Sequence, residues 1–231
     1  MKGKDFLSML TVCLSVMIAS CDGKQHEYVD LGLPSGTLWA THNLGASAPE
    51  DIGDYYAWGE TKPKKDYGLR TYEFFSEFYK EYGFDKVKKV NKYNFDETYG
   101  AVDNKAILDS SDDAAYVNWG GKWRMPTIDE WKELCDTMIC SSIPTILNGV
   151  KGFKVTSVKN GNSIFLPITG WRRGSELWHE GEIGYYWSSS RDPRDVATSS
   201  RCLHFDDVAP VMGWGINIRS DGLCIRPVRR P

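Results

Sequence analysis

The sequence reads DDAAYVNWGGKWRMPTIDEWKEL over residues 112–134, and this stretch decides the fold. It predicts two short helices separated by Gly120-Gly121, because glycine readily adopts the left-handed backbone that ends a helix. Ser110 or Ser111 is expected to cap the first helix, since a serine hydroxyl accepts a hydrogen bond from the free N–H groups of a first turn. The order helix, glycine pair, helix is the starting point for the rest of the chain.

The second helix carries the stronger signal. Thr127 and Glu130 have the T-x-x-E spacing of a capping box, in which each side chain binds the backbone N–H of the other residue. Apolar residues then recur at positions i, i+3, i+4 and i+7, which predicts one buried helix face. These residues are Trp131, Leu134, Cys135 and Met138.

Short strands are expected on both sides of this helical stretch. Leu33-Pro34-Ser35-Gly36 fits a tight turn, and Asn160-Gly161 is a dipeptide typical of hairpin turns. The expected strands are 28–32, 37–40, 152–158, 163–167, 185–190, 202–205 and 223–228. The expected fold class is therefore α+β, with two helices packed on short antiparallel strands and connected by long loops.

The segment from about residue 60 to 105 is predicted to be a long insert. It is rich in Tyr, Lys, Asp and Gly, has few aliphatic residues and shows no sustained period, apart from a short helix that the pattern allows over 72–82. Its aromatic content argues against disorder. Its lysines alternate with acidic residues and Tyr, so we interpret them as a solvated loop surface rather than a phosphate-binding one.

The N-terminus is typical of a bacterial export signal. A positively charged start precedes an apolar run over 6–18, which is too short to span a bilayer as a helix. The run ends in Ile18-Ala19-Ser20-Cys21, which resembles the lipobox of bacterial lipoproteins. We expect a signal peptide over 1–20, a lipid on Cys21 and a tether over 21–27 that holds the protein at a membrane of the cell envelope, in the periplasm or on the surface. An ordinary secretory signal and an N-terminal membrane anchor are the alternatives.

Length and composition limit the number of domains and the kinds of partner expected for the mature chain. About 210 residues fit one domain, over 28–231. Loss of the signal moves the net charge from −3 to −4, and this acidic balance argues against a nucleic-acid partner. The cysteines left after cleavage and lipidation have no CxxC or CxH spacing, so no metal site is expected. They are Cys135, Cys140, Cys202 and Cys224, and either disulfides in any of three pairings or buried free thiols fit their positions.

The motifs together carry a family resemblance. The segments are YVDLGLPSGTLWAT (28–41), YYAWGE (55–60), DDAAYVNWGGKWRMPTIDEWKEL (112–134), NGNSIFLPITGWR (160–172), GYYWSSS (184–190) and GLCIRPVR (222–229). They resemble the Fibrobacter succinogenes major paralogous domain family over nearly the whole mature chain. That resemblance implies a C-type lectin-like fold, with distant similarity to formylglycine-generating and sulfatase-modifying domains. It also implies an exported and often lipid-anchored protein.

The resemblance does not bring a catalytic or metal site with it. Formylglycine-generating enzymes use a closely spaced cysteine pair near the C-terminus, whereas Cys202 and Cys224 are 21 residues apart. Calcium-dependent lectins of this fold use EPN or QPD followed by WND, and neither motif occurs. No cofactor is expected, with calcium at Asp192-Pro193-Arg194-Asp195 or Asp206-Asp207 as the minor alternative.

The best ligand-binding candidates lie in the late loops. Exposed Trp and Arg side chains dominate binding hot spots, and loops carry such contacts in many folds. The candidates are Trp171, Arg172, Arg173, Trp178, His179 and Trp214. The opposing interpretation is that these rings close a loop-rich core.

Three functions follow from these patterns. The leading hypothesis is a lipid-anchored, non-catalytic binding module that recognises an unidentified glycan or protein. An enzyme of the sulfatase-modifying type or an unrecognised hydrolase is the second. A structural subunit of a cell-surface assembly is the third, and a free strand edge would support it.

Overall fold

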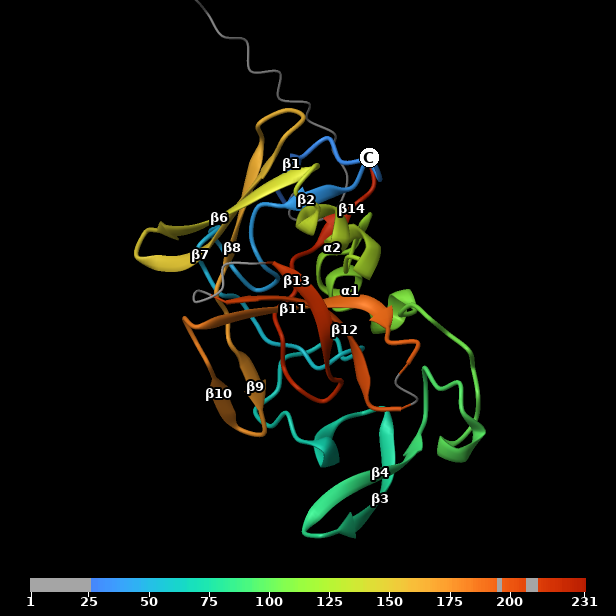
Figure 1. The fold of residues 1–231 in the computed structure, drawn as a ribbon. Coiled ribbons are helices and arrows are strands. Elements are labelled where there is room, and N and C mark those ends of the chain that lie inside the picture. Colours follow the sequence, from blue (N-terminus) through green and yellow to red (C-terminus); the bar gives the residue numbers. More distant parts are fainter. Residues whose placement is uncertain (1–25, 195–196, 207–211) are drawn as a thin grey trace, which may run out of the picture.

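The computed structural model describes residues 26–194, 197–206 and 212–231 (Figure 1). The helices are α1 (Ala114–Trp119) and α2 (Ile128–Cys135), with 3-10 turns η1 (Leu69–Thr71), η2 (Glu97–Tyr99) and η3 (Ser110–Asp112). The strands are β1 (Tyr28–Asp30), β2 (Leu38–Ala40), β3 (Phe75–Glu81), β4 (Phe84–Val90), β5 (Trp123–Arg124), β6 (Cys140–Leu147), β7 (Val150–Ser157), β8 (Ser163–Pro167), β9 (Trp171–Arg173), β10 (Glu176–Trp178), β11 (Ile183–Arg191), β12 (Ser199–Asp206), β13 (Gly213–Ile218) and β14 (Val228–Arg229). The α+β class is confirmed, with strands predominating. The predicted signal peptide and Cys21 lie outside the described residues.

The strands form several small antiparallel sheets. Their orders are β1-β2-β14-β5, β6-β7-β8 and β11-β12-β13, with the separate hairpins β3–β4 and β9–β10. Helix α2 contacts β6 and all three strands of the β11–β13 sheet. In Figure 1, β1, β2 and the C-terminus lie at one end of the molecule, and the β3–β4 and β9–β10 hairpins lie at the other. The two ends therefore present different surfaces.

The predicted hairpins at 28–40 and around Asn160-Gly161 are confirmed. In the first, the Gly36 N–H donates to Leu33 O over 2.9 Å and closes the turn between β1 and β2. In the second, β7 pairs with β8 across the Asn-Gly turn. The predicted strand at 223–228 is interrupted. Leu223 and Cys224 form isolated bridges with Tyr56 and Tyr186, and regular pairing between β2 and β5 begins only at Val228 and Arg229.

Helix α1 begins later than its serines suggested. Ser110 and Ser111 belong to η3, and the cap is Asp113, whose carboxylate accepts from the Tyr116 N–H over 3.0 Å. The same carboxylate accepts from the Met125 N–H, so it also fixes the start of the next segment. The predicted helix stop is confirmed, since Gly120 ends α1 with a φ of 68°.

The capping box of α2 is confirmed, and its Glu130 carboxylate also binds residues of other segments. Both hydrogen bonds between Thr127 and Glu130 are formed. The Glu130 carboxylate, 8% exposed, also accepts from Thr37 Oγ1 at 2.6 Å and from both terminal nitrogens of Arg124 at 2.5 and 2.7 Å. Burial alone would raise its pKa, but the hydrogen bonds from Arg124 and Thr37 outweigh burial and lower the pKa of Glu130 to about 2. One carboxylate thus joins the approach to β2, β5 and α2.

The apolar face of α2 is shorter than predicted. Trp131 and Leu134 are fully buried and Cys135 is half-buried, but Met138 is 83% exposed. The helix ends at Cys135, because Asp136 adopts an extended backbone and its carboxylate accepts from the Met138 N–H in a turn that leads into β6. Met138 therefore lies beyond the helix whose period predicted its burial.

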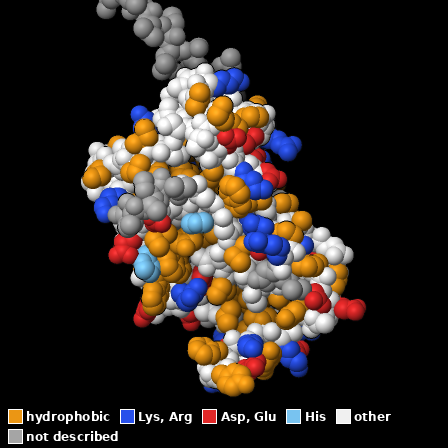
Figure 2. Space-filling model, in the orientation of Figure 1, with side chains coloured by type: hydrophobic (Ala, Val, Ile, Leu, Met, Phe, Trp, Pro, Cys, Tyr) orange, Lys and Arg blue, Asp and Glu red, His pale blue; other side chains and the backbone are white. Residues whose placement is uncertain are grey.

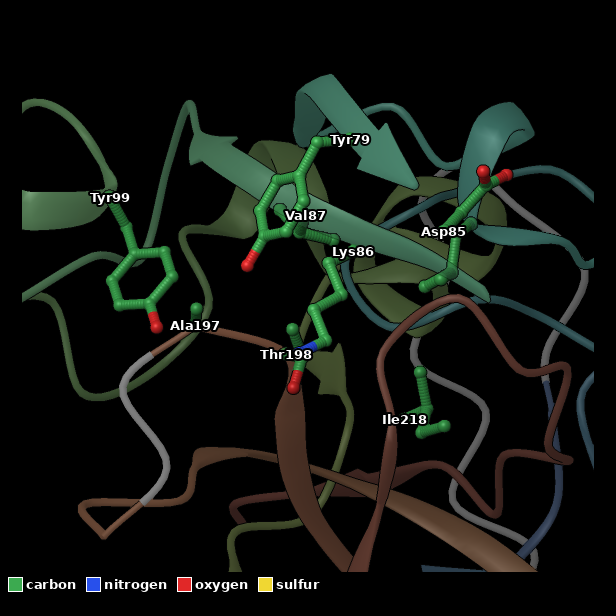
Figure 3. Close-up of a pocket in the computed structure, with 9 residues that line it drawn as sticks. Tyr79, Asp85, Lys86, Val87, Tyr99, Ala197, Thr198 and Ile218 are labelled. Carbon is green, nitrogen blue, oxygen red and sulfur yellow. The ribbon is translucent and has the colours of Figure 1, made fainter. Parts of the chain in front are cut away.

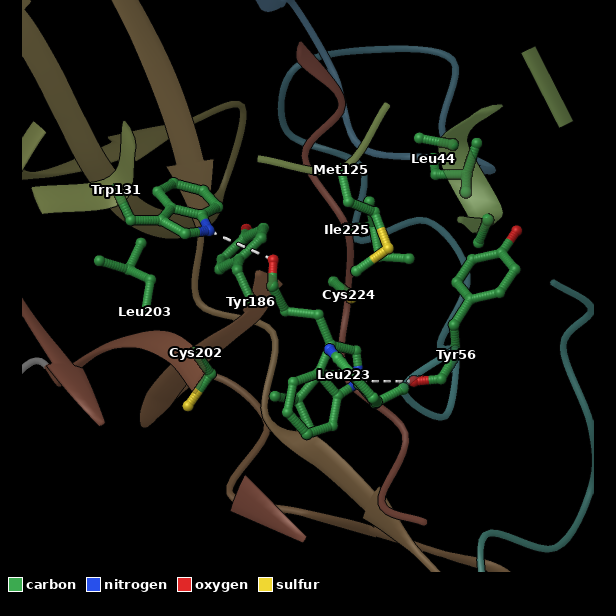
Figure 4. Packing of buried hydrophobic residues seen from close by; sticks show 14 of the residues in the cluster. Leu44, Tyr56, Met125, Trp131, Tyr186, Cys202, Leu203, Leu223, Cys224 and Ile225 are labelled. Carbon is green, nitrogen blue, oxygen red and sulfur yellow. Dashed lines mark hydrogen bonds between the residues drawn. The ribbon is translucent and has the colours of Figure 1, made fainter. Parts of the chain in front are cut away.

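Three buried tryptophans connect the core through their indole N–H groups. Trp131 Nε1 donates to Trp187 O at 3.2 Å, and Trp187 Nε1 donates to Tyr56 O at 2.8 Å (Figure 4). Trp58 Nε1 donates to Ser188 O at 2.8 Å. These indoles are fully buried. Each one therefore adds apolar area to the core without leaving a polar atom unpaired.

The segment predicted to be an insert is more regular than the sequence suggested, and the expected helix over 72–82 is wrong. Residues 75–90 form the β3–β4 hairpin, whose turn at Tyr82-Gly83 has positive φ at both positions, as a two-residue hairpin turn requires. The buried Arg219 fixes the insert to the sheet, because its side chain donates to Tyr93 O and Ser199 O and lies 4.9 Å from the Trp58 ring centroid.

The four cysteines within the described residues are free thiols. Cys140, Cys202 and Cys224 are buried and Cys135 is half-buried. Burial raises the pKa of the Cys135 thiol to about 12 and that of Cys140 to about 11, so neither is a reactive thiolate at neutral pH. Within the described ranges, no helix is long and apolar enough to cross a membrane.

We predict that Glu130→Gln lowers the free energy of unfolding by about 3 kcal/mol, because it removes the partner of the largely buried Arg124. Urea denaturation at neutral pH measures the loss. Asp129→Asn is the matched control on the same helix, since Asp129 is 83% exposed and its ion pair with Lys132 contributes below about 1 kcal/mol. Equal losses of unfolding free energy in the two variants would contradict the structural role assigned to Glu130.

The same pair gives a pH signature. The folded pKa of Glu130 is lowered from 4.5 to about 2, so its stabilisation is complete above pH 4.5 and is lost as pH falls toward 2. The stability difference between the wild-type protein and Glu130→Gln should shrink across this window. A difference that stays constant down to the acid limit would show that the charge of Glu130 is not the cause.

Candidate functional site

The β9–β10 hairpin carries most of the residues that the sequence selected. Trp171 and Trp178 are directly opposite each other in its register, so both side chains lie on one face. Gly170 precedes the hairpin with a φ of +64°, and a Cβ there would lie 2.4 Å from Trp178 O. Only glycine allows the chain to approach so closely and turn in this way.

A row of five aromatic rings runs from this hairpin onto the adjacent sheet. We call Trp178, His179, Trp171, Tyr185 and His204 the ring row. His179 stacks on Trp171 with centroids 4.9 Å apart and an interplanar angle of 11°. Tyr185 meets Trp171 edge-on at 5.1 Å, and His204 stacks on Tyr185 at 6.0 Å. Trp178 ends the row with its centroid 6.4 Å from that of His179.

The ring row is accessible along its length. Trp178 is 44% exposed, the His179 side chain is 42% exposed, and Trp171, Tyr185 and His204 are half-buried. In Figure 2, hydrophobic and histidine side chains gather on the left of the molecule, over β9–β10 and the near end of β11. Trp171 Nε1 is buried and has no hydrogen-bond partner among the described residues. Such a donor costs stability, and this cost is usual where a surface serves another purpose.

Two glycines in β13 leave the space above the His204 ring free of side chains. Gly213 is opposite His204 in β13, and Gly215 is two residues further on the same face. A Cβ would lie 3.1 Å from the His204 ring at Gly215 and 3.6 Å from it at Gly213. Burial lowers the pKa of His204, so its imidazole is neutral at neutral pH. This end of the row is an uncharged ring beside two strand positions that have no side chain.

Charged groups border the ring row. Arg173 makes a two-pronged ion pair with the buried Asp221, through Nε at 3.1 Å and Nη2 at 2.7 Å, while about half of the arginine side chain stays exposed. Burial raises the pKa of Asp221, and the hydrogen bond from Arg173 opposes that rise. At the hairpin base, His179 Nδ1 lies 2.7 Å from a Glu182 carboxylate oxygen. The border thus offers a fixed cation and an exposed carboxylate.

Two of the sequence candidates lie away from the ring row. Arg172 points to the other face of its hairpin, where its guanidinium lies 5.1 Å from the centroid of the buried Tyr55 ring. Trp214 is opposite Leu203 on the sheet face that turns away from His204, and Lys132 Nζ lies 5.9 Å from its ring centroid. The structure therefore brings together Trp171, Arg173, Trp178 and His179.

Sequence reasoning missed Tyr185 and His204. Both were placed in expected strands, but the pairing of β11 with β12 that sets them opposite each other cannot be deduced from either strand alone. The usable signal was the alternation of Gly213, Trp214 and Gly215. Gly at every second position of a strand often marks a surface that something else approaches.

Several grooves lie elsewhere. One of about 360 Å³ separates the β3–β4 hairpin from the ends of β12 and β13, with Tyr79, Lys86 and Tyr99 around it (Figure 3). Its charged groups are already paired, Asp85 with Arg70 and Lys86 with Glu81. An apolar groove of about 380 Å³ separates β1 from the β6–β8 sheet, and one of about 540 Å³ lies beside α1.

Within the described part of the chain, no group of three or more His, Cys, Asp or Glu residues could hold a metal ion. Of the minor calcium candidates, Asp192 is buried and binds Arg201 at 3.1 Å. Asp195 and Asp207 lie outside the described residues. The chain matches no protein-family model, no curated protein and no solved structure.

We predict that Gly170→Ala distorts the β9–β10 hairpin and lowers the free energy of unfolding by about 2 kcal/mol or more, because it adds a backbone clash to an unfavourable φ. Gly181→Ala is the matched control, since Gly181 has a φ of +72° but open space around its Cβ position. Chemical denaturation measures stability, and near-ultraviolet circular dichroism monitors the tryptophans. Equal effects in both variants would mean that the contact with Trp178 O does not matter.

Proposed function

We propose that this protein is an exported, lipid-anchored binding module that recognises a glycan through the ring row. The observation that carries the proposal is the continuous surface of Trp178, His179, Trp171, Tyr185 and His204. Sugar rings have apolar C–H faces that pack against the electron-rich faces of aromatic rings. Neighbouring rings of the row cover part of one another's faces, so a sugar would pack on the ring surface that stays exposed, which is greatest at Trp178 and His179.

The border of the row supplies the polar part of recognition. Hydroxyl groups need donors and acceptors at defined positions, and hydrogen bonds to charged groups are the stronger ones. Arg173 is held in place by Asp221 and keeps free donors on its exposed side. Glu182, whose side chain is 67% exposed, supplies acceptors near His179. This pairing of stacking faces with a fixed polar border favours a glycan over a purely apolar ligand.

We also infer that the chain belongs to the family that it resembles and that it carries a lipid anchor. The motifs that resemble the Fibrobacter succinogenes major paralogous domain family occupy fold-making positions, among them Gly120, Arg124, Thr127 and Glu130 around α2. Arg226 of the RPVR motif is buried and donates to Phe165 O and Asn43 Oδ1 at 2.8 Å each. These roles support a common scaffold, of C-type lectin-like fold, and the sequence of 1–21 supports its attachment to the cell envelope by a lipid on Cys21.

A glycan array probed with the purified protein tests the function, followed by calorimetry with the glycans that bind. We predict that Trp178→Ala weakens binding by about 2 kcal/mol, roughly 30-fold, as loss of a stacking residue at a hot spot does. Trp214→Ala is the matched control, because Trp214 is 48% exposed but lies outside the ring row. We expect the affinity of the Trp214→Ala variant for the same glycans to stay within about twofold of that of the unsubstituted protein.

Two results would contradict this proposal. One is a set of bound glycans whose affinity depends on Trp214 but not on Trp178. The other is an empty array together with a protein partner whose capture depends on Trp178, which would keep the ring row as a binding surface but replace the glycan by a protein.

A further inference from the structure

A second cluster of rings lies at the opposite end of the molecule, where the described chain begins. His26 stacks on Trp119 with centroids 3.7 Å apart and an interplanar angle of 7°. Trp123 meets Trp119 edge-on at 5.0 Å, and His42 does so at 5.3 Å. The first described residue is thus fixed against the last residue of α1.

Exposed apolar and cationic side chains surround this point. Tyr28 is 47% exposed, Tyr116 43% and Val117 49%. The Arg229 guanidinium lies 5.0 Å from the Tyr28 ring centroid, and Lys122 and Arg230 are exposed beside it. We call Tyr28, Tyr116, Val117, Trp119, Lys122 and Arg230 the N-terminal pole.

The N-terminal pole also contains a groove. Tyr116, Lys122 and Arg230 line the groove of about 540 Å³ beside α1. Lys122 Nζ donates to Pro231 O at 2.8 Å, which holds the ammonium group at the groove. Glu27 and Asp30 are the exposed acids on either side of Tyr28, and the cations Lys122, Arg229 and Arg230 outnumber them. Aromatic rings beside Lys and Arg are the residue types that concentrate where a membrane meets water, because the rings suit the headgroup layer and the cations attract anionic headgroups.

The length of chain before His26 sets how far this pole can be from a membrane. Cys21 is five residues upstream, and five residues span at most about 18 Å when fully extended. The headgroup layer on each side of the hydrocarbon core is itself roughly 5–8 Å thick. A lipid on Cys21 would therefore keep the N-terminal pole within reach of the headgroups.

We propose that the N-terminal pole is a membrane-contact surface that takes anionic lipid headgroups and fixes the orientation of the domain. This inference rests on the lipid anchor of the proposed function, but not on the ring row or its ligand. Since the β9–β10 and β3–β4 hairpins lie at the far end of the molecule from β1 and the C-terminus, contact at the pole directs them away from the membrane (Figure 1). The orientation leaves the ring row open to ligands that are not part of the same membrane.

The test places a fluorescent reporter at each end of the full chain. Val117→Cys at the N-terminal pole and Tyr82→Cys at the 91% exposed tip of the β3–β4 hairpin are labelled with the same environment-sensitive dye. The purified protein is reconstituted into vesicles of phosphatidylethanolamine and phosphatidylglycerol that carry a headgroup-attached quencher. The unsubstituted chain, labelled in parallel, corrects for native thiols such as the half-buried Cys135. Mass spectrometry of each preparation measures the lipid on Cys21.

We expect dye at Val117→Cys to be quenched several-fold more strongly than dye at Tyr82→Cys. Equal quenching at the two positions in a protein whose Cys21 carries lipid would overturn the membrane-contact surface and leave the anchor intact. A chain without lipid on Cys21 would overturn the anchor, and the inference with it. Neither result depends on glycan binding, which the array measures separately.

Discussion

The carboxylate of Glu130 is the constraint on which the rest of the structure depends. It is removed from water and receives donors from Thr37, Thr127 and Arg124, which precede β2, open α2 and end β5. A buried carboxylate with incomplete partners would be costly, so these segments must come together for any of them to be stable. Once α2 is fixed in this way, Trp131 reaches the β11–β13 sheet through Trp187, and that sheet supports the β9–β10 hairpin. The candidate binding surface is thus held by an interaction far from it.

Local signals in the sequence were sufficient for much of the fold. The capping box, the glycine stop after α1 and the Asn-Gly turn each depend on a few neighbouring residues, and each was predicted correctly. The failures also have local causes. The pattern over 72–82 allowed a short helix, but the turn at Tyr82-Gly83 pairs this segment with a partner strand instead. Asp113 capped α1 in place of a serine because it could bind Met125 as well. Asn148-Gly149 between β6 and β7 was an available hairpin signal that went unused.

Part of the candidate site could be predicted from the sequence. Trp171, Trp178 and His179 are close in sequence, so composition selected this segment as a binding loop, but the structure shows that it is the β9–β10 hairpin. Tyr185 and His204 join them only through the register between β11 and β12, and that register is fixed by packing of the whole sheet. The same dependence on register explains why Trp214 lies outside the ring row. A shift of one residue moves a side chain to the other face of a strand, so its neighbours Gly213 and Gly215 share a face with His204 whereas Trp214 does not.

The position of β14 has a consequence for when the fold can form. The last strand of the chain lies inside the four-stranded sheet, between β2 and β5, and buried Arg226 just before it binds backbone of β2 and β8. A chain that emerges N-terminus first, from a ribosome or through a membrane, cannot complete this sheet until β14 has emerged. The contacts that close the sheet join the most distant parts of the sequence, which makes their formation intrinsically slow. The topology thus delays closure of this sheet until β14 is available.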